Sequence, residues 1–334
     1  MILQMNRNKV IDIAKGIGIL LVVLGHQIDY FGADLPQVYR FIYLFHVPLF
    51  FFLSGMFFHE QENFWNCFKK KFLRLFVPYL LANIFFFFVE MARVWKLGVA
   101  YDGDLCWKDL WLACAGLWPV LSMLSRPTWF ILVLFRITII YKLIQILTGN
   151  RKWLMAFLCV VIGIIGAVYA PGTYMLGQTM VALPFLCAGH LCGAGIVGNK
   201  KLFGTASSVI GIVVVIPLLY LLSMHQQTNI AVNVYDNVVL MFVGAIIGIL
   251  AMLWISKLIE KLPVLTRFFS FIGQYTLSIL IWHIFVMKVL FTALEYVGWG
   301  SNPLTLVIAF IAAVLIPCAM SIIYNKIKLR ICSL

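Results

Sequence analysis

Charged side chains are scarce in this sequence, and acidic ones are the scarcest. Of its 334 residues, 11% are charged, with 12 acidic residues against 25 basic ones, while 63% are hydrophobic. A water-soluble domain typically has roughly 25% charged residues. The scarcity of charge therefore excludes a soluble globular enzyme and predicts an integral membrane protein.

Two patterns that would point to other classes of protein are also lacking. The formal net charge is +13, but the lysines and arginines fall in short clusters between apolar runs, with no long basic arm and no basic patch interleaved with aromatics. Nucleic-acid binding is therefore not expected. The eight cysteines form no CxxC pair and no Cys/His spacing typical of zinc, so no metal site is expected.

What the sequence has in abundance is long apolar runs. A membrane-spanning helix needs about 20 predominantly apolar residues. Windows of this kind predict ten spans, at 10–30, 40–58, 73–96, 128–148, 153–170, 177–196, 203–224, 236–256, 268–291 and 303–325. The sequence thus predicts an all-α integral membrane protein, a bundle of about ten transmembrane helices that forms a single domain over residues 1–334.

The linkers between these spans alternate in charge. One set is rich in basic residues: Arg7 and Lys9; Lys69, Lys70, Lys71 and Arg74; Arg151 and Lys152; Lys200 and Lys201; Lys257, Lys261 and Arg267; and Lys326, Lys328 and Arg330. The other set has few: Arg40, Lys96, Lys108 and Arg126. Because cytoplasmic loops have an excess of Lys and Arg, the first set is predicted to be cytoplasmic, together with both termini.

The first span has three ionisable residues, Asp12, Lys15 and His26. Ionisable groups inside lipid are costly, so their default interpretation is functional. Lys15 and His26 are eleven residues apart, close to three turns, so they share one helix face about 16 Å apart along the axis. Asp12 lies one turn from Lys15. A lysine at the membrane rim and a histidine deep inside could hold the two ends of a long, phosphate-bearing ligand.

The second span has a histidine of its own, His46, with Pro48 beside it. A proline inside a helix kinks or loosens it and frees backbone groups. His26 and His46 fall on adjacent antiparallel spans at similar outer depth, which favours a shared polar cavity. A lone membrane histidine can also be a hydrogen-bonded packing residue, and this alternative stays open for His46.

Three segments together resemble a known family. They look like the membrane-bound acyltransferase-3 family, and most like its fucose 4-O-acetylase-like sugar O-acetyltransferases. All three lie within residues 11–80: IDIAKGIGILLVVLGH, FHVPLFFFLSGMFF and KKKFLRLFVPYL. The match is thinner at PTWFILVLF (127–135) and GQYTLSILIWHIF (273–285), and residues 150–265 match only in hydropathy.

The resemblance implies an enzyme that takes acetyl groups from cytoplasmic acetyl-CoA. The acceptor would be a hydroxyl of a cell-envelope or surface glycan, or of its lipid-linked precursor, in a protein of the bacterial inner membrane surrounded by lipid. Lys15 matches the family's basic position, His26 its essential histidine, and Lys71 and Arg74 its basic stretch after span two. Lys15 stands where many relatives have arginine, which keeps the charge and loses bidentate binding. Relatives often have an arginine pair where this chain has KKKFLR.

The residues also suit this chemistry on their own. A neutral histidine can take the proton of a sugar hydroxyl as it attacks a thioester, and apolar surroundings favour the neutral form. Alternatively, His26 attacks first and holds the acyl group as an acyl-imidazole. We predict catalytic roles for His26, His46 and Asp12, although an Asp12–Lys15 surface pair is an equal alternative for Asp12.

Further polar residues lie within later spans. Trp129 and Arg136 in span four and His283 in span nine are predicted to bind the acceptor, and Arg136 needs a carboxylate, carbonyl or ligand partner inside lipid. Glu90 and Arg93 are one turn apart and are predicted to pair. His190 lies among small residues in AGHLCGAG and is predicted mainly to pack.

Two readings from other classes of protein remain open, a transporter or flippase and a membrane sensor or scaffold, and the second of these would need no deep Lys/His line. A polytopic chain with charges inside its spans also suits a transporter or flippase of a glycan or anionic small molecule. Against it, the two halves of the sequence show no repeated pair of broken helices. The sugar, the hydroxyl and the oligomeric state are not predicted.

Overall fold

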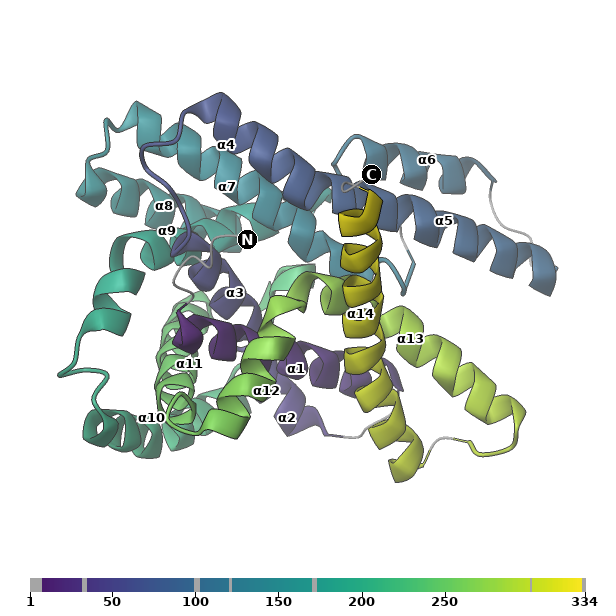
Figure 1. Cartoon of the computed structure of the whole chain (residues 1–334). Helices are drawn as coiled ribbons and strands as arrows, with labels where there is room; N and C mark the ends of the chain where they lie inside the picture. The colour runs from purple at the N-terminus through teal and green to yellow at the C-terminus, as the bar shows by residue number, and fades with distance from the viewer. Residues whose placement is uncertain are drawn as a thin grey trace. The chain divides into compact units, whose positions relative to one another are not determined.

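The computed structural model describes residues 8–31, 35–98, 103–119, 122–169, 173–300 and 302–331, and these are almost entirely helical (Figure 1). The α-helices are α1 Lys9–Phe31, α2 Pro36–Tyr43, α3 His46–Gly55, α4 Phe64–Lys71, α5 Val77–Leu97, α6 Gly103–Cys114, α7 Trp129–Leu147, α8 Lys152–Val168, α9 Leu176–Gly198, α10 Thr205–His225, α11 Val238–Ile259, α12 Pro263–Gln274, α13 Thr276–Tyr296 and α14 Pro303–Ile331. Short elements are the π-helix η1 Phe72–Phe76, the 3₁₀ turns η2 Arg126–Thr128, η3 Thr173–Met175 and η4 Ile230–Val232, and the strands β1 Thr228–Asn229 and β2 Val234–Tyr235.

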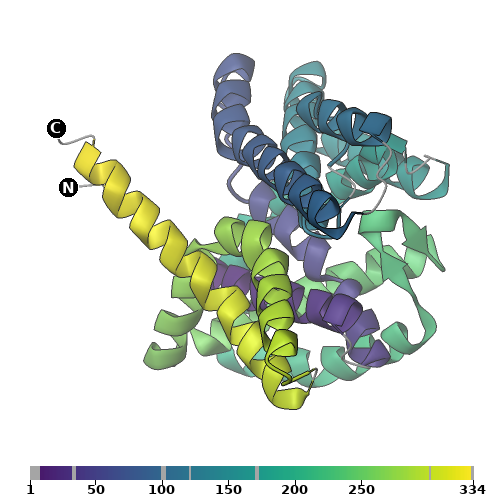
Figure 2. The same ribbon diagram turned by 90° about the vertical axis from the view of Figure 1, so that its right-hand side faces the viewer.

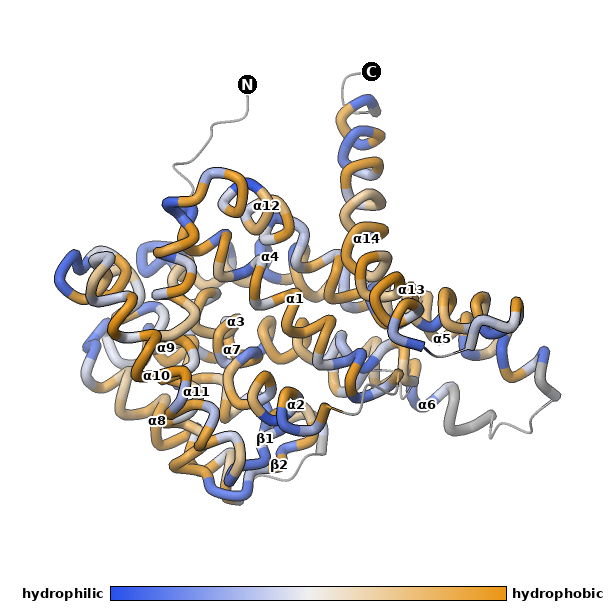
Figure 3. Tube along the Cα trace, turned by 90° about the horizontal axis from the view of Figure 1, so that it is seen from below, coloured by the Kyte–Doolittle hydropathy of each residue, from blue (hydrophilic) through white to orange (hydrophobic). Residues whose placement is uncertain are grey.

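The predicted fold class is confirmed. In the described part of the chain nine helical segments are long and apolar enough to cross a membrane, and the 17-residue α8 is a shorter apolar helix at the position of the remaining predicted span. Apolar residues dominate these helices, and polar residues gather in linkers and at ends such as the last turns of α14 (Figure 3). The chain is therefore an all-α, polytopic integral membrane protein.

Two predicted spans are each divided into two helices, as Pro48 indicates for the first of them. The span at 40–58 is divided into α2 and α3 at Leu44 and Phe45. Pro48 explains the break, because proline lacks an N–H and its ring clashes with the carbonyl four residues earlier, here that of Leu44. The span at 268–291 is divided into α12 and α13 at Tyr275, so its membrane-spanning part begins at Thr276.

The chain separates into two compact units, which we describe one at a time. Unit 1 comprises Met1–Phe50, Ile196–Gln227 and Leu240–Leu334, and unit 2 comprises Phe51–Gly195 and Thr228–Val239. The single domain predicted over residues 1–334 stays a prediction.

Unit 1 is built on close contact between α1 and α12. A Cβ on Gly16 would lie 2.1 Å from the carbonyl oxygen of Phe269, and one on Gly273 would lie 2.0 Å from that of Asp12. Only glycine permits backbones to approach this closely, as is common between membrane helices. Helix α13 also packs against α1, and α14 lies along α13 (Figure 2). Helix α1 is thus held on more than one side.

Unit 2 has a similar close backbone contact at glycine residues, between the end of α3 and α9. A Cβ on Gly55 would lie 2.0 Å from the Leu186 carbonyl oxygen, and one on Gly189 would lie 1.9 Å from that of Phe52. Small residues in the FLSG segment and in the AGHLCGAG segment therefore pack the two helices backbone to backbone.

Hydrogen bonds within unit 2 join linkers that the charge pattern assigns to the same side of the membrane. At the side predicted to be cytoplasmic, Gln145 Nε2 donates to the Glu60 carbonyl oxygen (2.9 Å) and to Asn150 Oδ1 (2.6 Å), which lie on different linkers. From the N-terminal half of α7, Arg136 donates to carbonyl oxygens of Gly116 and Tyr174, again on different linkers. The linkers that these hydrogen bonds join are therefore ones that the charge pattern assigns to the same side of the membrane.

Candidate active site

Three histidines from separate elements of unit 1 meet in one cluster. The ring of His26 in α1 lies 5.2 Å from that of His283 in α13, measured between centroids. The Tyr43 ring lies 6.5 Å from His26 and 4.7 Å from His46. Tyr43 at the end of α2 therefore stands between His26 and His46, and the three imidazoles with this phenol form the histidine cluster. The structure thus brings together all three histidines predicted to act on the substrates.

The break between α2 and α3 places His46 in this cluster. His46 is the first residue of α3 and only 4% of it is exposed. Its Nδ1 lies 2.9 Å from the Ile42 carbonyl oxygen. Because a carbonyl oxygen only accepts, Nδ1 holds the hydrogen, and in the neutral ring Nε2 keeps its lone pair. His46 is thus a buried imidazole with a fixed tautomer.

His283 has the same tautomer for the same reason. Its Nδ1 lies 2.8 Å from the carbonyl oxygen of Ile279, one turn earlier in α13, and the side chain is fully buried. Its Nε2 is buried and accepts no hydrogen bond from any residue that the structure describes. A buried acceptor without a donor is costly and calls for an explanation, such as a ligand or a proton in transit.

His26 is the more accessible of the three histidines. It is half-buried, and Tyr30, one turn later in α1, stacks on it at 5.5 Å with the ring planes only 5° apart. Tyr39 in α2 stacks on Tyr43 at 3.8 Å. The His26 imidazole therefore lies against the rings of Tyr30 and Tyr43, which restrict its orientation.

Asp12 and Lys15 lie at the opposite end of α1. Helix geometry places them about 21 Å and about 16 Å from His26 along the axis. Both are half-buried. Asp12 is therefore not part of the histidine cluster, and its predicted catalytic role stays a prediction that would have to operate at the Lys15 end of the helix.

The basic stretch predicted to bind the donor lies in unit 2. Lys71 ends α4 and is half-buried, and Arg74 is exposed in η1, the π-helix that follows. One cation of this stretch, Lys70, is ion-paired with Glu62. A π-turn rotates the side chains after it relative to a regular helix, and such turns occur often at functional sites. Sequence reasoning gave no signal for this element.

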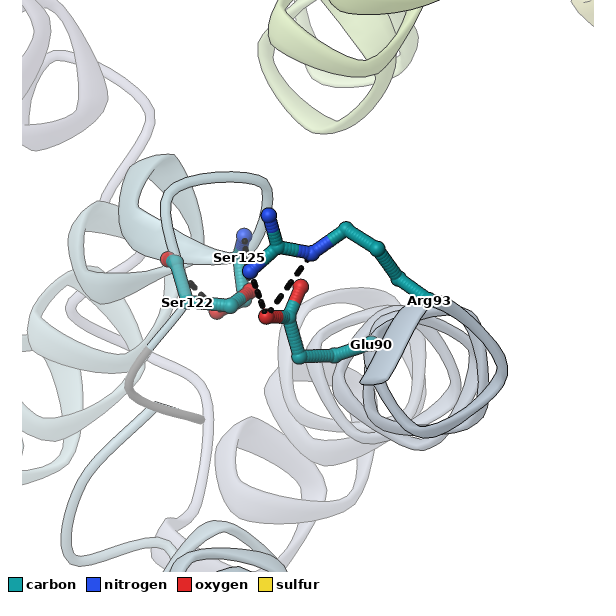
Figure 4. Close-up of polar contacts among 4 residues, drawn as sticks. All are labelled: Glu90, Arg93, Ser122 and Ser125. Carbon is teal, nitrogen blue, oxygen red and sulfur yellow. Dashed lines mark hydrogen bonds and ion pairs between the residues drawn. The ribbon is translucent and has the colours of Figure 1, made fainter. Parts of the chain in front are cut away.

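Trp129 begins α7 and is buried, with its ring 6.2 Å from that of Phe130. The turn before it is held by hydroxyl groups: Ser122 Oγ and Ser125 Oγ are 3.0 Å apart, and Thr128 Oγ1 donates to the Ser125 carbonyl oxygen at 2.7 Å. Figure 4 draws these serines together with Glu90 and Arg93 of α5. The start of α7 is thus a rigid, hydrogen-bonded turn.

The predicted pair of Glu90 and Arg93 is confirmed. Arg93 Nη2 lies 2.6 Å from Glu90 Oε1, and Nε lies 3.2 Å from the same oxygen (Figure 4). Arg136, one of the predicted substrate residues, instead bonds three backbone carbonyl oxygens, those of Tyr174, Gly116 and Leu117. The predicted need of Arg136 for a partner within the span is met by carbonyl groups.

Sequence reasoning missed a second polar cluster, at the end of unit 2 that the charge pattern predicts to be cytoplasmic. His190 Nε2 lies 3.2 Å from Glu60 Oε1, and His190 Nδ1 lies 2.8 Å from the Tyr141 hydroxyl. Lys142, only 2% exposed, donates to the Glu60 carbonyl oxygen at 2.9 Å and to Gln145 Oε1 at 2.7 Å. His190 is therefore more than a packing residue. Lys142 within span four was the available signal, since a lysine there needs partners.

A cavity of about 310 Å³ adjoins this second cluster and is lined by polar residues that include Glu60, Asn63, Lys142, Gln145 and Asn150. No group of three or more His, Cys, Asp or Glu side chains in the described ranges could hold a metal ion. The polar groups of this cavity bond mainly one another, and they fix the turn between α3 and α4 that precedes the basic stretch.

Comparison with known proteins bears on both units. A family model described as an acyltransferase domain matches residues 8–322. The chain is also similar to the Nodulation protein NolL of Mesorhizobium japonicum, with 27% identity over 196 residues, which is 56% of this chain and 48% of that protein. The chain thus matches about half the length of this curated relative. No solved structure matches.

Proposed function

The chain belongs to the acyltransferase-3 family and is an integral membrane acyltransferase, and from this premise we propose a specific reaction. The protein transfers an acetyl group from cytoplasmic acetyl-CoA to a hydroxyl of a cell-envelope or surface glycan, or of its lipid-linked precursor. Its place would be the bacterial inner membrane. The observation that carries the proposal is the pairing of His26 with His283, whose rings lie 5.2 Å apart within a membrane-spanning bundle.

The histidine cluster has the group that this reaction needs most. A sugar hydroxyl is a weak nucleophile, and a positioned base that removes its proton contributes typically 10² to 10⁴ in rate, as an order of magnitude. In the direct route the hydroxyl oxygen bonds the thioester carbonyl carbon while its proton moves to the His26 imidazole. The C–S bond then breaks, and the proton passes from His26 to the departing coenzyme A sulfur.

An alternative route uses the same histidine as nucleophile. His26 would attack the thioester, release coenzyme A and hold the acetyl group as an acetyl-imidazole until the acceptor hydroxyl takes it. Incubation with acetyl-CoA in the absence of acceptor distinguishes the two routes. Acetylated His26 in the intact-protein mass spectrum supports the second route, and an unmodified protein that still transfers when acceptor is added supports the first.

The other two histidines suit supporting roles in this scheme. His46 and His283 each donate from Nδ1 to a backbone carbonyl, so each neutral ring offers the lone pair of Nε2. We assign to His283 Nε2 a hydrogen bond with the acceptor hydroxyl or with the ring N–H of His26, because it is a buried acceptor that the described residues leave without a donor.

Donor binding is assigned first to Lys15. It lies about 16 Å along α1 from His26, a length that an extended pantetheine arm spans. Lys15 would bind a phosphate of coenzyme A, and the thioester would then extend toward His26. Lys71 and Arg74 lie in the basic stretch that the charge pattern predicts to be cytoplasmic, and by family resemblance they remain proposed donor-binding residues of unit 2.

Sealed, oriented proteoliposomes test the reaction and its direction. Radiolabelled acetyl-CoA supplied on the cytoplasmic side should label a glycan acceptor, whereas acetyl-CoA supplied on the other side should not. A single cysteine introduced in the loop at 225–237 reports orientation, since an impermeant thiol reagent should reach it only from the extracytoplasmic side. Transfer from either side alike, or no transfer by correctly oriented protein, would refute the proposed reaction.

A further inference from the structure

Arg136 is a charged residue inside a membrane span, and each of its hydrogen-bond partners among the described residues is neutral. It lies in α7 and is half-buried. Its Nη1 donates to the Tyr174 carbonyl oxygen, and its Nη2 donates to the carbonyl oxygens of Gly116 and Leu117, the last at 3.2 Å. No carboxylate of the described residues forms an ion pair with it. Among the described residues, the positive charge is therefore solvated by backbone dipoles and paired with no carboxylate.

The guanidinium also has hydrogen-bonding capacity to spare. A guanidinium has five N–H donors, and the three carbonyls take three of them. The Nε–H and one N–H of Nη1 bond no residue in the part of the chain that the structure describes. A retained charge with two further donors is what recognition of an anion requires.

The backbone around Arg136 is held in an unfavourable conformation. Tyr174 and Met175 both have positive φ, at 55° and 59°, although neither is glycine. Such residues persist only where the surroundings enforce them, and they gather at ligand sites. The strained turn presents the Tyr174 carbonyl to Arg136, so the strain serves to complete the shell around the guanidinium.

The linker that contains Gly116 and Leu117 is also held in place. Tyr79 is buried and its hydroxyl donates to the carbonyl oxygen of Trp118 at 2.9 Å, directly after the two carbonyls that Arg136 binds. Gly116 has φ 65°, and a Cβ there would lie 2.6 Å from the Phe76 ring. The guanidinium thus lies in a preformed shell, built from two linkers that the charge pattern assigns to the extracytoplasmic side.

We infer that Arg136 binds an anionic group at the extracytoplasmic end of unit 2. That group is the phosphate of a lipid-linked sugar or the carboxylate of an acidic sugar, so the acceptor of the transfer reaction is an anion. The role in transfer rests on the proposed function, whereas the binding of the anion does not and can be measured without acetyl-CoA.

Direct binding to the full-length protein in nanodiscs tests the inference. Two pairs of probes share a tail and differ in charge: geranylgeranyl diphosphate against geranylgeraniol, and octyl glucuronide against octyl glucoside. The variants are Arg136→Gln and Arg136→Lys, with Arg93→Gln as a control that removes an arginine from the same unit. We expect one anionic probe to bind at least tenfold tighter than its neutral partner. Arg136→Gln should abolish this preference, Arg136→Lys should keep part of it, and Arg93→Gln should leave it unchanged.

Every outcome decides the question. Preference for the diphosphate identifies a lipid-linked acceptor, and preference for the glucuronide identifies an acidic sugar. Equal affinity for charged and neutral probes in the unsubstituted protein overturns the inference, and this comparison remains valid even if the variants do not fold. A preference that survives in folded Arg136→Gln also overturns it. Anion binding in a protein that transfers no acetyl group would instead uphold the site and refute the proposed function.

Discussion

The imidazole of His26 in α1 and that of His283 in α13 lie 5.2 Å apart, with their ring planes tilted by 37°. The two residues are remote in the sequence, and they meet because α13 packs against α1. His283 Nδ1 is occupied by the Ile279 carbonyl, so it is Nε2 that remains for chemistry. The two imidazoles therefore differ in their surroundings, since that of His26 is half-buried and that of His283 is fully buried.

Substitutions of His283 should distinguish the roles of its two ring nitrogen atoms. An asparagine amide reaches the position of Nδ1, and a glutamine amide reaches that of Nε2. If the Nε2 acceptor orients the reacting groups, His283→Asn should lower kcat at least tenfold and His283→Gln should lose less, as expected for a group that assists proton transfer. Steady-state rates of acetyl transfer by folded variants measure this. Greater loss in His283→Gln would show that only the bond to Ile279 matters.

Lys15 should govern donor affinity. If its charge binds a coenzyme A phosphate, Lys15→Ala should weaken acetyl-CoA binding at least tenfold, whereas Lys15→Arg keeps the charge and should be tolerated. The affinity should also fall with added salt, because exposed charges are screened beyond about 8 Å at physiological ionic strength. Calorimetric titration with acetyl-CoA measures this. Unchanged donor affinity in Lys15→Ala would remove Lys15 from the donor site.

Lys142 should stabilise unit 2 rather than act in the reaction. Lys142→Met keeps the length of the side chain and removes the donors to the Glu60 carbonyl and Gln145 Oε1. The Glu60 carbonyl still accepts from Gln145 Nε2, whereas Gln145 Oε1 becomes a buried acceptor that has lost its donor, which costs about 1 to 3 kcal/mol. The melting temperature in detergent should fall by several degrees, while Lys152→Met at an exposed position should change it little. Equal melting temperatures for the two variants would argue against a stabilising role of the Lys142 hydrogen bonds.

The contact of α1 with α12 should tolerate no side chain at Gly16. A Cβ there would lie 2.1 Å from the Phe269 carbonyl oxygen, and overpacking of this kind costs typically about 1 to 3 kcal/mol. Gly16→Ala should lower the melting temperature and, because Lys15 is adjacent, raise KM for acetyl-CoA. Gly195→Ala is the matched control, since a Cβ there meets nothing within 4 Å. Gly16→Ala with unchanged stability would show that the helices lie further apart.

Much of the fold could be predicted because hydropathy and charge act locally along the chain. The apolar runs predict the spans, and the spacing of Glu90 and Arg93 predicts their pair. Pro48 predicts a disturbed second span, though not that Tyr43 would end α2 and stand between His26 and His46. The spans, the Glu90–Arg93 pair and the disturbed second span follow from local sequence, whereas their geometry comes from the structure.

Other features depend on contacts between remote segments and could not be predicted. His283 entered the prediction through family resemblance, and no spacing in the sequence places it beside His26. Similarly, His190 among small residues looks like a packing residue, and only the fold reveals its bonds to Glu60 and Tyr141. The π-helix at Phe72–Phe76 has no sequence signature, since it reflects how α4 and α5 are packed.

The most direct test of the proposed reaction is the rate of acetyl transfer by His26→Ala, compared with His225→Ala, which removes an exposed histidine from the same unit. Both proteins should insert into the membrane and melt like the unsubstituted protein, and Lys15 should still bind acetyl-CoA. Transfer to the glycan acceptor should fall at least a hundredfold in His26→Ala, within the range expected for loss of a general base, and stay unchanged in His225→Ala. Full transfer by His26→Ala would contradict the account.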